Sequence, residues 1–128
     1  MTDSLGGKSV LIVEDEIIIG MMLCSEITSA GGTSIGPVTS VAAAIKEIDS
    51  RAVDAVILDG KLVDGSGAEL VGYLKQRRIP YVVVSGYDKE SLPRGLKGAP
   101  FIAKPISVPL LMEAIERLGL PYEQASSD

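Results

Sequence analysis

Four short apolar runs constrain the fold of this chain more than any other feature. They lack the alternation of apolar and polar residues that marks a strand with one solvent-exposed face. The runs are residues 10–13 (VLIV), 55–58 (AVIL), 81–84 (YVVV) and the briefer 101–103 (FIA). Continuous apolar runs of this length are typical of parallel strands that are covered on both faces. Residues 33–38 are a weaker candidate for another strand, because Gly36 and Pro37 interrupt the pattern.

Helical patterns separate these runs. Residues 17–30 are apolar over much of a helical circumference, and Ser40, Ser66 and Ser107 each stand where they can begin a further helix. A helix is also expected at 87–98 by alternation, although two glycines and a proline weaken it. Strand and helix thus alternate along the whole chain.

This alternation predicts an α/β fold in which helices cover both faces of a parallel sheet through right-handed crossovers. For five strands we expect the flavodoxin-like (βα)5 three-layer sandwich with strand order 2-1-3-4-5. The 128 residues suffice for one core. We therefore expect a single domain at 8–118, with tails at 1–7 and 119–128.

Composition excludes several classes of function. The chain has no histidine, which rules out a Ser-His-Asp triad, a histidine metal site and a phosphohistidine carrier. A net charge of −5 and a pI of about 4.7 argue against a nucleic-acid partner or an anionic membrane surface. The basic group Lys75, Arg77 and Arg78 is better explained as a helix C-terminus than as a phosphate-binding patch.

Cysteine usage and hydropathy indicate the compartment. The single cysteine, Cys24, forms no intramolecular disulfide, which fits a reducing environment, and it lies in an apolar run as a small core residue would. No charged-then-apolar leader begins the chain, and no apolar run approaches the ~20 residues of a membrane span. We expect a cytoplasmic protein without a membrane partner.

Charged and polar residues follow the predicted strands at the point where each ends. Glu14 and Asp15 follow the first, Asp59 the third, Ser85 the fourth and Lys104 the fifth. In the expected topology these strands are neighbours, and their carboxyl ends open onto the rim where α/β sheets bind ligands. Three carboxylates this close repel one another unless a cation intervenes, and oxygen ligands favour Mg²⁺. Asp59, central in the set, is a candidate nucleophile that forms an acyl phosphate.

Together these residues resemble the receiver domains of two-component response regulators. The resemblance covers residues 8–118 and rests on the motifs LIVEDE, VILDG, VVVSG and FIAKP. The spacing after Asp59, with Asp64-Gly65, Gly67 and Leu70, also fits. The tripeptide SGY at 85–87 resembles the motif of a mostly single-domain alphaproteobacterial subgroup, the FATGUY-like receivers.

The resemblance implies a role for each site residue. Asp59 would accept a phosphoryl group from a phosphohistidine on a sensor histidine kinase or a phosphotransfer protein. Mg²⁺ would be bound by Asp15, Asp59 and the backbone carbonyl of Lys61, with Glu14 acting largely through water. Ser85 would turn toward the phosphoryl group and Lys104 would pair with it. Two further features are implied: Phe101 as the aromatic switch residue, and a cis bond between Lys104 and Pro105.

Such a domain would not be an enzyme in the ordinary sense, because it would catalyse only its own phosphorylation and dephosphorylation. No segment after the receiver is suited to bind DNA, so the output would be protein binding, phosphoryl relay or a phosphate sink. In the first helix, Ile18, Met21 and Met22 exceed what one core-facing stripe needs. The surplus would dock on a kinase's helical bundle or on a second copy of the chain, as a homodimer. The alternative is a wider buried stripe.

Two other functions remain open at this point. One is a Mg²⁺-dependent phosphohydrolase with an aspartyl-phosphate intermediate, which the lysine at position 61 and the lack of a cap domain disfavour. The other is a phosphate-independent interaction module on the same fold, against which the complete set of acids, hydroxyl and lysine argues.

Overall fold

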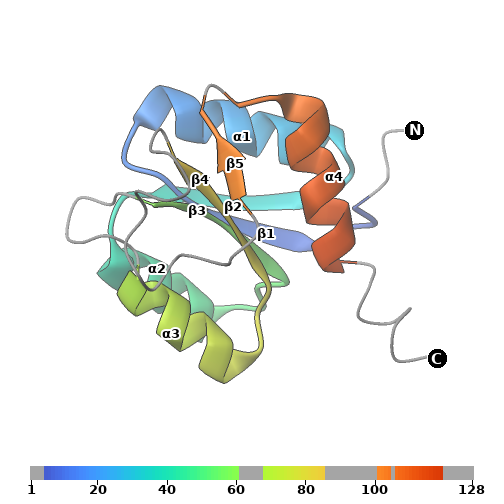
Figure 1. The fold of residues 1–128 in the computed structure, drawn as a ribbon. Coiled ribbons are helices and arrows are strands. Elements are labelled where there is room, and N and C mark those ends of the chain that lie inside the picture. Colours follow the sequence, from blue (N-terminus) through green and yellow to red (C-terminus); the bar gives the residue numbers. More distant parts are fainter. Residues whose placement is uncertain (1–4, 61–67, 86–100, 105, 120–128) are drawn as a thin grey trace.

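The computed structural model of the chain describes residues 5–60, 68–85, 101–104 and 106–119 (Figure 1). Five parallel strands form one sheet in the order β2-β1-β3-β4-β5, which confirms the predicted order 2-1-3-4-5. Their bounds are β1 (Ser9–Val13), β2 (Thr33–Val38), β3 (Ala55–Asp59), β4 (Tyr81–Ser85) and β5 (Phe101–Ala103). The weaker candidate at 33–38 is therefore a true strand, at the edge of the sheet.

Helices cover both faces of this sheet, as the continuous apolar runs predicted. Their bounds are α1 (Ile17–Ser29), α2 (Val41–Ser50), α3 (Ala68–Arg77) and α4 (Val108–Gly119). Figure 1 shows α1 and α4 on one side of the strands and α2 and α3 on the other. The weak helix expected at 87–98 lies outside the described residues.

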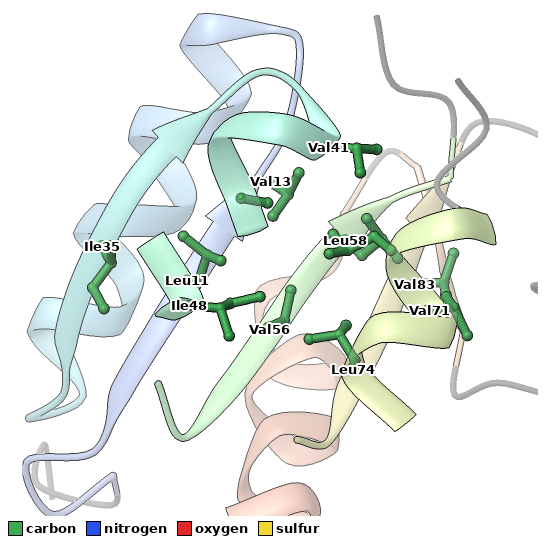
Figure 2. Close-up of a cluster of buried hydrophobic side chains, with 12 residues drawn as sticks. Leu11, Val13, Ile35, Val41, Ile48, Val56, Leu58, Val71, Leu74 and Val83 are labelled. Atoms are coloured by element: carbon green, nitrogen blue, oxygen red, sulfur yellow. The ribbon is translucent and has the colours of Figure 1, made fainter. Parts of the chain in front are cut away.

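The core is divided by the sheet into two layers, and alternate residues of each strand enter opposite layers. In β1, Leu11 and Val13 face α2 and α3, whereas Val10 and Ile12 face α1 and α4. Figure 2 shows the first layer, where Leu11 and Val56 lie beside Ile48 of α2. A strand that is buried on both sides cannot alternate with polar residues, which explains the sequence pattern.

Local interactions set the helix ends. The Ser40 hydroxyl accepts a hydrogen bond of 3.1 Å from the Ala43 amide at the start of α2, as the cap prediction required. Helix α3 carries Lys75 and Arg77 in its last turn, where positive charge complements the helix dipole. The capping box expected at Ser66 falls outside the described residues.

The N-terminal segment contributes more than the sequence indicated. Leu5, assigned to a tail at 1–7, is buried and packs in the layer of α1 and α4. Its amide donates a hydrogen bond of 3.0 Å to the carbonyl of Ala30 at the end of α1. Leu5, within the predicted N-terminal tail, thus takes part in the core. Within the described residues no helix has the length and apolarity to cross a membrane.

Candidate functional site

The predicted site residues meet at the carboxyl end of the sheet. Asp59 is the last residue of β3 and Ser85 the last of β4, while Glu14 and Lys104 directly follow β1 and β5. Backbone hydrogen bonds connect these ends: the Lys104 amide donates to the Ser85 carbonyl at 2.9 Å. Glu14, Asp59 and Ser85 are almost wholly buried. The sheet therefore brings together side chains that are far apart along the chain.

Three carboxylates form a cluster at this rim. Glu14, Asp15 and Asp59 each offer an oxygen, and these oxygens lie within 4.8 Å of one another. Glu14 Oε1 is buried and has no hydrogen-bond partner among the described residues. A buried, unpaired carboxylate oxygen is costly, and neighbouring anions add repulsion. Both costs are relieved by a divalent cation, and the all-oxygen donor set suits Mg²⁺.

Lys104 places one positive charge against this cluster. Its ammonium nitrogen lies 3.0 Å from Glu16 Oε1, 3.2 Å from Glu14 Oε2 and 3.8 Å from Asp59 Oδ1. The contact with Glu16 was not anticipated from the sequence. The available signal was a third acid in the run EDE, but a charged residue before a helix is common without such a contact.

The surroundings of Lys104 shift its titration. Burial by itself lowers the pKa of the Lys104 ammonium, because a low-dielectric environment disfavours the charged form. The hydrogen bond to Glu16 and the charges of Asp59 and Glu14 outweigh burial, so the pKa lies above its ordinary value. Lys104 is therefore a permanent cation at neutral pH.

Some features assigned by resemblance cannot be located, because they involve residues or side chains that the structure does not describe. Lys61 and the Lys104–Pro105 bond lie outside the described residues, and of Phe101 only the backbone, in β5, is described. The roles proposed for them from the sequence stay predictions.

The outer face of α1 carries the apolar surplus seen in the sequence. Ile18 is 82% exposed, Met21 60% and Met22 36%, so the alternative of a wider buried stripe is wrong for these residues. Leu23 and Ile27 form the buried stripe instead. Cys24 is half-buried and packs against the core, as the sequence indicated.

Comparisons with known proteins agree with this arrangement. Residues 10–116 match the family described as the response regulator receiver domain. The chain is 32% identical to the polar-differentiation response regulator DivK of Brucella ovis, over 85% of this chain and 94% of DivK. It is 30% identical to the swarming motility regulation protein RssB of Serratia marcescens over 87% of this chain, and it spans about half of RssB (52%).

A solved structure has the same fold. The BeF3-activated conformation of SdrG from Pseudomonas melonis Fr1 superimposes with a TM-score of 0.76 at 30% identity. The match covers 94% of this chain and all of SdrG (100%).

Proposed function

The chain belongs to the response regulator receiver domain family, and we propose that it is a response regulator that accepts a phosphoryl group on Asp59. The observation that carries the proposal is the convergence of Glu14, Asp15 and Asp59 within 4.8 Å, with the Lys104 ammonium beside them. The donor would be a phosphohistidine of a sensor histidine kinase or a phosphotransfer protein.

Mg²⁺ is the cofactor that fits the cluster. Glu14, Asp15 and Asp59 would hold it, and the resemblance adds the backbone carbonyl of Lys61. The buried Glu14 Oε1, which lacks a hydrogen-bond partner, supports this assignment, because the ion or a water bound to it would supply one. Bound there, the ion offsets the negative charge that otherwise opposes the approach of an anionic phosphoryl donor.

Each site residue then has its own role in phosphoryl transfer. An oxygen of Asp59 forms a bond to phosphorus while the bond from phosphorus to the histidine nitrogen of the donor breaks. Lys104, held as a cation, pairs with an oxygen of the transferred group. The Ser85 hydroxyl, at the end of the neighbouring strand, donates to another. Phe101 would then follow Ser85 as the switch residue.

The test is an amide NMR titration with Mg²⁺ followed by beryllofluoride, a phosphoryl mimic. Wild type should respond to both, with shifts at Ser85 and Lys104, whereas Asp59→Asn should not respond to beryllofluoride. Asp54→Asn is the matched control, because Asp54 stands before β3 at the opposite end of the sheet, where it accepts a hydrogen bond from Ser9. A wild type that ignores beryllofluoride would favour the phosphate-independent interaction module instead.

We assign docking of the kinase to the outer face of α1. Its exposed apolar side chains, Ile18, Met21 and Met22, offer a contact for a helical bundle, and they lie on the helix that begins beside the acidic cluster. A kinase seated there would bring its phosphohistidine toward the rim. The same face would serve a second copy of the chain if the output requires a homodimer.

A substitution on α1 separates docking from chemistry. Ile18→Glu should slow phosphorylation by a phosphohistidine donor protein but leave phosphorylation by acetyl phosphate unchanged, because the small donor needs no docking surface. Ile18 is exposed, so the fold should tolerate the change. Equal rates with the protein donor would contradict docking on α1. Sedimentation of both proteins with beryllofluoride tests whether this face joins two copies.

A further inference from the structure

The carboxylate of Glu16 binds the Lys104 ammonium more closely than the two buried acids do. The separations are 3.0 Å to Glu16, 3.2 Å to Glu14 and 3.8 Å to Asp59. The last exceeds a hydrogen-bond length. Lys104 is therefore hydrogen-bonded to Glu14 and Glu16, whereas its contact with Asp59, the proposed phosphoryl acceptor, is a longer ion pair.

The backbone around Glu16 is arranged for this contact. Glu16 occupies the N-cap position of α1 in an extended conformation, yet its side chain caps no helix amide. Its own amide donates a hydrogen bond of 3.1 Å to Glu14 Oε2, the oxygen that also binds Lys104. Glu16 is thus anchored through its backbone, while its carboxylate is left to reach the ammonium.

Exposure distinguishes Glu16 from the other acids at the site. Its side chain is 59% exposed, against 1% for Glu14 and 5% for Asp59. An exposed carboxylate regains solvation when its ion pair breaks, whereas a buried one does not. Of the contacts of Lys104, the one with Glu16 is therefore the easiest to exchange for a new anion.

We propose that Glu16 is a positioning residue that keeps the Lys104 ammonium beyond hydrogen-bond length of Asp59 until a phosphoryl group competes for it. The inference rests on the function proposed above. It adds a residue that sets the balance between Lys104 paired with Glu16 and Lys104 paired with the phosphoryl group. A phosphoryl group on Asp59 brings more negative charge than one carboxylate and forms charge-assisted hydrogen bonds. Lys104 then leaves Glu16, and breaking that contact reduces the affinity for the phosphoryl group.

The first measurement is the affinity for beryllofluoride at saturating Mg²⁺, followed by amide NMR. Glu16→Ala should bind about two- to fivefold more tightly than wild type, the range that one partly exposed ion pair supplies. Glu16→Asp should behave like Glu16→Ala, because it keeps the charge but is one methylene shorter and does not reach Lys104. If Glu16→Asp instead matches wild type, charge acts at a distance and the contact proposal is overturned.

The second measurement uses the protein without Mg²⁺ or beryllofluoride. The side-chain ammonium resonance of Lys104 should shift, and its exchange with solvent should quicken, in both Glu16→Ala and Glu16→Asp. Unchanged resonances would overturn the proposal. If wild type binds beryllofluoride with the same affinity as both variants, only this inference fails. If wild type does not bind it at all, the proposed function fails as well.

Discussion

Neutralising Asp59 should stabilise the metal-free protein, although it removes the proposed acceptor. Asp59 lies within 4.8 Å of carboxylate oxygens of both Glu14 and Asp15. At an effective dielectric constant of about 20, each such repulsion amounts to about 3.5 kcal/mol. The attraction to Lys104 at 3.8 Å offsets about 4.4 kcal/mol of it on the same scale. Over these three contacts alone, the balance is a net repulsion of about 2–3 kcal/mol.

Asp59→Asn removes this repulsion and keeps the size of the side chain. In EDTA we expect the free energy of unfolding to rise by about 2 kcal/mol and the melting temperature by about 5–10 °C. Mg²⁺ should reduce the advantage: at ten times its dissociation constant it stabilises wild type by about 1.4 kcal/mol and Asp59→Asn by less. Urea unfolding with and without Mg²⁺ measures both effects.

The control is Glu116→Gln, which removes one negative charge from α4. Glu116 takes part in no ion pair within the portion of the chain that the structure describes. The Glu116→Gln variant should therefore differ from wild type in its free energy of unfolding by less than about 0.5 kcal/mol. If Asp59→Asn in EDTA is no more stable than wild type while the control behaves as expected, the repulsion reasoning is refuted. Lys104 would then already balance the cluster.

Three further outcomes are expected from the structure. Lys104→Met should lower the unfolding free energy by at least about 2 kcal/mol in urea, because it leaves the buried Glu14 carboxylate without its cation; an unchanged midpoint would contradict the ion pair. Gly36→Ala should lower the free energy of unfolding by about 2 kcal/mol or more. Gly36 has a φ of +106°, and a Cβ there would lie 2.8 Å from the Ile12 carbonyl oxygen. A variant as stable as wild type would disprove the clash. Burial raises the pKa of the Cys24 thiol and outweighs a smaller lowering by a hydrogen bond with Ser34. Less thiolate is therefore present at pH 8, and alkylation of Cys24 should be slower in the native protein than in urea. Equal alkylation rates would contradict the raised pKa.

The fold and most of the site were predictable because both follow from strand burial and topology. Runs such as 55–58, which are apolar at every position, are typical of parallel strands that helices cover on both faces. Once the strand order is 2-1-3-4-5, the residues that end the strands share one rim, whatever their rotamers. Glu14, Asp59 and Lys104 could therefore be brought together from the sequence.

Contacts made by long side chains could not be predicted in the same way. Glu16 and Lys104 stand 88 positions apart, and their pairing depends on how far α1 begins beyond β1 and on which way two flexible side chains extend. Leu5 was likewise unpredictable, because a single apolar residue before a strand indicates nothing about whether a helix end will cover it.

The sequence by itself determined the architecture, the rim and the chemical identity of the cluster, because periodicity and strand order act on the backbone. Only the tertiary structure decided which side of α1 stays uncovered and which acid holds Lys104. Hydrophobic periodicity measures how much apolar surface a helix has, but its neighbours decide how much of it they bury: Leu23 is fully buried, whereas Ile18 remains exposed. In the same way, charge pattern supplies candidate partners for Lys104, and three-dimensional packing selects among them.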